Sequence, residues 1–452
     1  MGGLALGAVL LLLVAGIVLA SARWRVDAFL LLVLSALIFG LCAGLGLEGT
    51  LENIKQGFGS TLGGVGLVII FGAMIGVFLE RTGASSSIAG TMLRAVGEKR
   101  AGLSLSLTGF LVSIPVFCDS GFIVLVPLVR AIAAKTAVST LALAVCLATG
   151  LYATHCLVPP TPGPVAAAEA LGADLGRVIL LGLPVALVLA LAGYFWAMRF
   201  ASWTDRSGDP ALQRPAGAAD DSDRAGPGRE APGAFRSMLP IIVPLVLITL
   251  GSLSRLESAP FGSGTFCSLI SGMGHPVFAL GLGLVFSFPL SGAGDPHMKW
   301  VAAGITSCAM VLAVTAAGGA FGRVIRESEL SVTLQEVLGG WRAGVLVPFV
   351  LAAAIKSAQG SSTVSLITTA AIMQPLLGPL GLAGSPWGPA LTVVAIGCGS
   401  MTVSHANDSY FWVVSQMAGI PVPDAYRAYT TATALMGLSG AVVTLGMAAL
   451  LL

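Results

Sequence analysis

The chain has 452 residues, of which 56% are hydrophobic and only 10% charged, and its mean hydropathy is +0.93. Soluble globular proteins carry roughly 25% charged residues, and several apolar runs here reach the ~20 residues that cross a bilayer. The net charge of +2 comes without a basic block that would indicate a nucleic-acid partner. The composition excludes a soluble protein and predicts an all-α polytopic membrane protein.

The first apolar run, LALGAVLLLLVAGIVLA, covers residues 4–20 and is followed by ARWRV. The junction, ASARWRV, offers no convincing small-residue cleavage site. We therefore expect a retained membrane helix and not a removable signal peptide.

A charge interrupts the next informative stretch, which reads SIPVFCDSGFIVLVPLV from 113 to 129. Pro115 and Gly121 both disturb helices, so we expect unwound backbone with free N–H groups at Asp119, Ser120 and Gly121. Asp119 could then accept hydrogen bonds from substrate hydroxyls, or hold a coupling proton once burial favours its neutral form. The alternative is an aspartate that only caps the following helix.

A broken span follows at THCLVPPTPGP, residues 154–164. No continuous helix survives these closely spaced prolines, so we expect the span to break and to resume near Val165. Thr154, His155, Pro160 and Thr161 are candidate site residues at this break.

Residues 202–236 are rich in Pro, Gly, Ala and mixed charge, which predicts a flexible cytoplasmic linker. The linker separates two halves, 1–201 and 237–452, in which the same features follow one another.

The second half contains KSAQGSSTVS at residues 356–365. Small hydroxyl residues at a helix start can cradle a carboxylate, with a lysine supplying positive charge. The candidates are Lys356, Gly360, Ser361, Ser362 and Thr363. Small-residue helix packing and a lysine that snorkels to the membrane surface are the alternatives.

A second interruption, SHANDSYFW at 404–412, supplies His405, Asn407 and Asp408. His405 matches His155 in position within its half, and histidine titrates near neutral pH. The pair of histidines therefore favours a role in substrate or proton binding over packing alone.

Each half is expected to cross the membrane five times and to add one re-entrant hairpin with a polar tip. An odd number of crossings places two such halves in opposite orientation, which is the inverted-repeat architecture of secondary transporters. Lysines and arginines in the first half favour an N-terminus on the outside.

Enzyme signatures are absent from the sequence. There is no Walker A motif and no HExxH, and the seven cysteines lack zinc-like spacing. We expect no enzymatic activity, no cofactor and no metal site.

The motifs FCDSGFIVLVPL, THCLVPPTPGP, QGSSTV and SHANDSYFW, in this order, closely resemble those of the gluconate permease (GntP) family of proton-coupled symporters. The resemblance covers nearly the whole chain, and that family belongs to the wider ion-transporter superfamily. The resemblance implies a multi-pass protein of the cell (inner) membrane. It implies import of gluconate or a similar small hydroxylated monocarboxylate with protons, by a homodimer with elevator-like movement of the hairpins. Transport of D-serine or glycerate is the alternative within the same family, and sodium coupling, as in related superfamily members, is the alternative to protons. An intramembrane enzyme or a channel-like receptor is the alternative of another class.

Three residues depart from the family pattern, and these departures bear on the identity of the substrate more than on its chemical class. Asp119 stands where glutamate is more common, Thr161 where a histidine is common, and Lys356 where an arginine is common.

Overall fold

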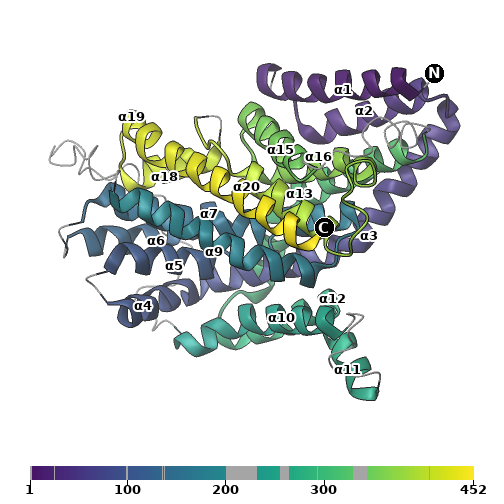
Figure 1. The fold of residues 1–452 in the computed structure, drawn as a ribbon. Coiled ribbons are helices and arrows are strands. Elements are labelled where there is room, and N and C mark those ends of the chain that lie inside the picture. The colour runs from purple at the N-terminus through teal and green to yellow at the C-terminus, as the bar shows by residue number, and fades with distance from the viewer. Residues whose placement is uncertain are drawn as a thin grey trace.

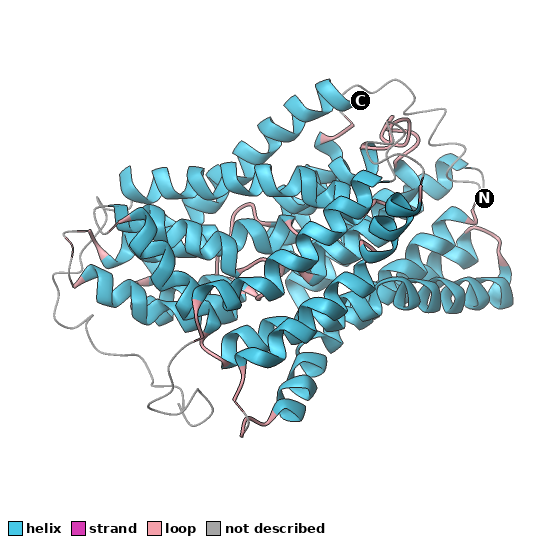
Figure 2. Ribbon diagram, turned by 90° about the horizontal axis from the view of Figure 1, so that it is seen from below, coloured by secondary structure: helices cyan, strands magenta, loops and turns pink. Residues whose placement is uncertain are grey.

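The computed structural model describes residues 3–24, 26–97, 100–134, 136, 138–199, 232–254, 264–292, 294–328, 344–406 and 408–452. These residues form helices and short connections, and the described part contains no strand (Figure 2). The expectation of an all-α fold is confirmed.

The first half of the chain forms nine helices within the described residues. They are α1 (Gly3–Trp24), α2 (Ala28–Cys42), α3 (Gly46–Arg81), α4 (Ala84–Val96), α5 (Ala101–Val112), α6 (Cys118–Ala133), α7 (Thr140–Leu157), α8 (Pro162–Leu171) and α9 (Leu175–Arg199).

The second half repeats the order of a long helix, a helix pair meeting at a tip, a broken helix and a final helix. Its described elements are α10 (Ala234–Ser254), α11 (Thr265–Met273), α12 (Pro276–Ser287), η5 (Phe288–Leu290), α13 (His297–Arg326), α15 (Leu346–Gln359), α16 (Ser362–Met373), η6 (Gln374–Leu376), α17 (Gly388–Ser400), α18 (Ser409–Ala418), α19 (Val422–Ala425), η7 (Tyr426–Thr430) and α20 (Thr431–Leu451).

The two longest helices, α3 and α13, make the most extensive helix–helix contact in the described molecule (Figure 1). Glycines bring their backbones together, because a Cβ atom at Gly57 would lie 2.7 Å from the carbonyl oxygen of Gly319. Close approach through small residues is the usual way in which helices associate where lipid gives no hydrophobic drive.

The core of the molecule surrounds α7, in which every residue from Leu141 to Leu157 is buried. A helix that is apolar on all sides is expected in the interior of a bundle and not at its surface. Three helices, α5, α6 and α9, pack against α7. The polar groups at the C-terminal end of α7 are thereby carried into the interior.

The predicted break after Thr154 is confirmed: α7 ends at Leu157 and α8 begins at Pro162. The helix resumes three residues before Val165 because proline fits the first turn of a helix, where its missing N–H costs nothing. The second predicted break is also present, between α17 and α18.

Within the described residues, six helices are long and apolar enough to cross a membrane, with α7 and α8 counted as one, or seven if the bent pair α11 and α12 is one span. The arms of the two hairpins hold 12, 16, 14 and 12 residues, fewer than the ~20 that a crossing needs. Five crossings in each half, and the inverted orientation of the halves, stay predictions. α10 begins at Ala234, inside the predicted linker, and residues 202–231 lie outside the described part.

Candidate functional site

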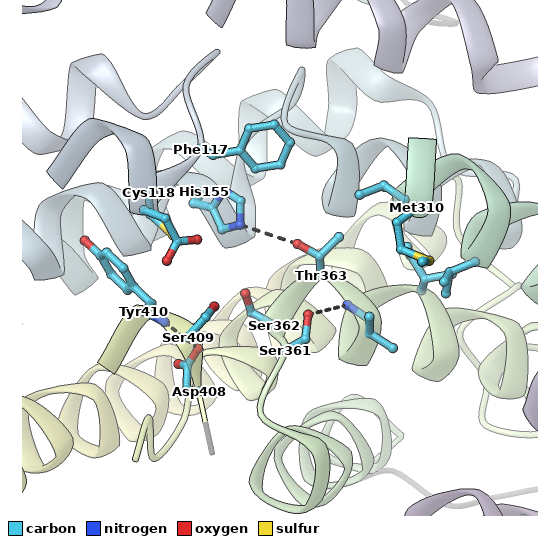
Figure 3. A pocket seen from close by; sticks show the side chains of 15 residues that line it. Phe117, Cys118, His155, Met310, Ser361, Ser362, Thr363, Asp408, Ser409 and Tyr410 are labelled. Atoms are coloured by element: carbon cyan, nitrogen blue, oxygen red, sulfur yellow. Dashed lines mark hydrogen bonds between the residues drawn. The ribbon is translucent and has the colours of Figure 1, made fainter. Parts of the chain in front are cut away.

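The ends of four helices meet around one pocket of about 220 Å³ (Figure 3). Its lining consists of Phe117, Cys118 and Asp119 from the start of α6, His155 from α7, Met310, Val311 and Val314 from α13, Ser361, Ser362, Thr363, Val364 and Ile367 from the start of α16, and Asp408, Ser409 and Tyr410 from the start of α18. Pockets for drug-sized molecules usually measure ~300–1,000 Å³, so this pocket suits a smaller solute.

Asp119 lies in the first turn of α6 with its Oδ1 atom buried and without a hydrogen-bond partner. Phe117 is the N-cap and makes no side-chain cap bond, so the capping alternative is wrong. The expected unwinding at Gly121 is also wrong, because its N–H donates to the Phe117 carbonyl at 2.9 Å. The turn lies earlier, at 113–117, where the Ser113 hydroxyl donates to the Val116 carbonyl at 2.9 Å.

His155 faces the same pocket from the last turn of α7, and its side chain is almost fully buried. Its Nε2 atom lies 3.5 Å from the Thr363 hydroxyl, and its Nδ1 atom has no partner. The ring also contacts Phe117, with ring centroids 5.9 Å apart. The imidazole therefore lines the pocket with one ring nitrogen near Thr363 and the other buried without a partner.

The start of α16 presents backbone donors to the pocket. Gly360 has a φ of +95°, which lets the chain turn sharply between α15 and α16. Ser361 caps α16 by accepting a hydrogen bond from the Val364 N–H at 3.3 Å. The first N–H groups of a helix have no acceptor within the helix and, together with its dipole, favour an anion.

Lys356 and Asp408 form a buried ion pair beside the pocket. The Lys356 Nζ atom lies 2.7 Å from Asp408 Oδ2 and 2.6 Å from the Gly360 carbonyl. Asp408 Oδ2 also accepts from the Ser404 hydroxyl and, at 3.4 Å, from the Tyr152 hydroxyl. Its Oδ1 atom accepts from the Tyr410 N–H at 3.0 Å, so Asp408 caps α18.

This network joins the tip of the second hairpin to the break between α17 and α18. The Lys356 side chain has 0% exposure and does not line the pocket, whereas Asp408 does. The lysine therefore acts on the pocket through Asp408.

The pocket brings together six of the predicted site residues: Asp119, His155, Ser361, Ser362, Thr363 and Asp408. It does not include Ser120, Gly121, Thr154, Pro160, Thr161, Lys356, Gly360 and His405, and Asn407 lies outside the described residues. The two histidines are not equivalent here, since His405 Nε2 lies 3.2 Å from the Ser357 carbonyl of α15.

Sequence reasoning missed the other lining residues. Phe117, Cys118, Ser409 and Tyr410 lie inside the recognised motifs FCDSGFIVLVPL and SHANDSYFW, so membership of a motif was the available signal. The α13 residues had no such signal, because that helix reads as an ordinary apolar span. In the part of the chain that the structure describes, no group of three or more His, Cys, Asp or Glu residues is arranged to hold a metal ion.

A helical membrane protein whose interrupted helices enclose a pocket for a small solute belongs to the class of membrane transport proteins. The model of the GntP family of permeases matches residues 5–451, and the chain belongs to this family. It is thus a multi-pass membrane permease and not an enzyme.

Three relatives illustrate the family. The chain is 30% identical to a gluconate permease of Pseudomonas aeruginosa, with 96% of each chain covered. It is 31% identical to the inner membrane permease YgbN of Escherichia coli, covering 93% of each chain. It is also 31% identical to the D-serine transporter DsdX of Escherichia coli, covering 94% of each chain.

Among solved structures, the fold is similar to the YdaH transporter of Alcanivorax borkumensis, with a TM-score of 0.66. That likeness covers 93% of this chain and 98% of the other at 15% identity. The family and the relatives confirm the expected location in the inner membrane.

Proposed function

We propose that the protein is a secondary active symporter that imports a small hydroxylated monocarboxylate, the class to which gluconate belongs, together with protons. The observation that carries the proposal is the composition of one pocket. The pocket contains helix N–H groups that suit the carboxylate of a substrate. It also contains the side-chain carboxylate of Asp119, whose buried Oδ1 atom has no partner.

The N-terminal end of α16 is the proposed place for the substrate carboxylate. Ser362 and Thr363 lie in its first turn and line the pocket, and His155 stands within 3.5 Å of the Thr363 hydroxyl. Of the two carboxylate partners expected from the sequence, Lys356 and the helix end, we propose the helix end, because the lysine is already paired with Asp408.

The balance of charge supports a coupled cation. Lys356 neutralises Asp408, whereas Asp119 has no ion-pair partner among the described residues. A bound substrate carboxylate would bring a second uncompensated negative charge into the same pocket, and unpaired charges inside a membrane protein are costly. A proton on Asp119 removes one of these two negative charges. It also turns the carboxyl group of Asp119 into a hydrogen-bond donor for a substrate hydroxyl.

Asp119 therefore has two compatible roles in the proposed cycle. It takes up the coupling proton before or with the substrate, and it binds a hydroxyl while the pocket is occupied. The two hairpins would carry the pocket across the membrane by an elevator-like displacement, in a homodimer of inverted repeats, as the family resemblance implies.

Purified protein in proteoliposomes tests this proposal. Labelled gluconate and glycerate are offered with an inside-alkaline pH gradient, without sodium, and with the membrane potential clamped. We expect accumulation above equilibrium that a protonophore abolishes, and no accumulation of the tricarboxylate citrate. Accumulation that requires a sodium gradient would replace protons by sodium as the coupling ion, and passive equilibration alone would refute symport.

A further inference from the structure

One wall of the pocket comes from α13, a helix that carries none of the recognised motifs. This wall consists of Met310, Val311 and Val314. Met310 is 59% exposed, and Figure 3 shows it on the opposite side of the pocket from Asp408 and Tyr410. We call these three residues the α13 wall.

The position of the α13 wall follows from how α13 packs on α16. A Cβ atom at Gly318 would lie 3.2 Å from the Ile367 side chain, and one at Gly322 would lie 3.5 Å from the Ala371 carbonyl. Residue numbers rise together along both helices, so α13 and α16 run in the same direction where they touch.

The wall continues this contact toward the start of α16. Positions spaced by three or four residues share one face of a helix, so Met310, Val311 and Val314 lie on the face that holds Gly318. One turn corresponds to about 5.4 Å, and the same register sets Val314 beside the first turn of α16. Met310 and Val311 then extend one turn past the N-terminus of α16.

The pocket is consequently two-sided. Its hydrogen-bonding groups come from α6, α7, α16 and α18, whereas α13 contributes only apolar side chains. Val364 and Ile367 of α16 widen the apolar side. Ser361, Ser362 and Thr363 lie between Met310 on one side and Asp408 and Tyr410 on the other (Figure 3), so a solute whose carboxylate lies at the start of α16 has room to place its other end against the α13 wall.

Polarity at the far end of the solute decides its affinity for such a pocket. A hydroxyl that loses water without gaining a partner lowers affinity by roughly five- to a hundredfold. A methylene that leaves water for an apolar wall raises affinity by about fourfold. A chain with hydroxyls at every carbon is therefore a poor match for the α13 wall.

We propose that the preferred substrate is a short amphipathic hydroxy acid of about three to five carbons, in keeping with this small pocket. Its carboxylate and a nearby hydroxyl bind the polar side, and an alkyl end or no further chain faces Met310 and Val314. This inference rests on the proposed function and narrows its substrate class. It makes Met310 a specificity-determining residue.

Exchange in proteoliposomes tests the inference with four acids: glycerate, 2-hydroxybutyrate, 2-hydroxypentanoate and gluconate. Each unlabelled acid competes with labelled glycerate for exchange. We expect 2-hydroxybutyrate to inhibit at a concentration at least about tenfold below gluconate, since it exchanges several unpartnered hydroxyls for one apolar contact. Equal or better inhibition by gluconate overturns the inference but leaves the proposed function standing.

Variants of the wall provide the second arm. Met310→Gln and the nearly isosteric Val314→Thr give the wall hydrogen-bonding groups, and we expect each to shift the preference toward gluconate by about fivefold or more. Met298→Gln is the matched control, because Met298 lies on the same helix, is 71% exposed and does not line the pocket. An unchanged preference in both wall variants overturns the assignment. If one variant does not fold, the other and the wild-type comparison decide the question. Each acid is also offered in labelled form for self-exchange, and failure of all four to exchange overturns both this inference and the proposed function.

Discussion

Replacing Lys356 by methionine removes the only ion-pair partner that the described structure gives Asp408. Both side chains are buried, at 0% and 4% exposure, so water cannot stabilise the remaining carboxylate. Breaking a buried pair by deleting one partner costs about 3–5 kcal/mol of the free energy of unfolding. We expect a large fall in the midpoint of unfolding of the purified protein in detergent.

The double variant Lys356→Met with Asp408→Asn removes both charges together. Replacing a buried pair as a whole is often neutral, and the asparagine side chain would keep an acceptor for the N-terminus of α18. We therefore expect the double variant to recover most of the lost stability. Lys55→Met is the control, because Lys55 and Glu52 form an exposed pair whose loss should be undetectable.

The unfolding midpoint and the KM for uptake then distinguish a structural role of Lys356 from a role in binding the substrate. If Lys356 mainly orders the second hairpin through Asp408, the single variant loses stability and the double variant regains it. A single variant with wild-type stability and a KM raised tenfold or more would refute this reasoning. That result would instead support the sequence-based prediction that the lysine binds the substrate carboxylate directly.

Three further predictions follow from the pocket and its supports. Cys118 should react with a small methanethiosulfonate reagent more slowly than the partly exposed Cys267, because Cys118 is only 2% exposed and thiol reagents need an accessible thiolate. Mass spectrometry of the labelled protein measures this, and faster labelling of Cys118 would contradict its burial at the start of α6. His155→Asn should raise the KM for uptake about tenfold through loss of a pocket-facing contact, and His405→Asn should raise it less. Initial uptake rates measure both values, and the reverse order would contradict the placement of the two rings. Gly76→Ala should lower the unfolding midpoint by a destabilisation of about 1–3 kcal/mol, because its Cβ would lie 2.6 Å from a backbone carbonyl of the first hairpin; Gly59→Ala, with open space around its Cβ, is the control, and equal midpoints would contradict the packing argument.

The all-helical fold class and the two helix interruptions could be predicted from the sequence, because their causes are local. Apolar runs fix the helices, and the prolines at 159, 160, 162 and 164 permit no continuous helix between α7 and α8. The position of the first hairpin's turn could not be placed as well. A glycine such as Gly121 tolerates a helix, so its presence after Asp119 did not determine where the helix began.

Six of the fifteen pocket-lining residues could be predicted, because polar residues stand out in apolar surroundings. The partners of those residues could not, since they depend on contacts between distant segments. Lys356 and Asp408 are 52 residues apart, and nothing in either motif indicates that one neutralises the other. The α13 wall could not be predicted for a different reason. The sequence of an apolar helix does not indicate whether a methionine or valine faces a solute or lipid.

The central claim is that Asp119 holds the coupling proton in a pocket that also binds the substrate. Asp119→Asn tests it most directly, because asparagine keeps the size and an acceptor oxygen but cannot exchange a proton. In proteoliposomes we expect this variant to exchange labelled for unlabelled substrate while failing to accumulate it under an inside-alkaline gradient. Gradient-driven accumulation at the wild-type level would contradict the claim.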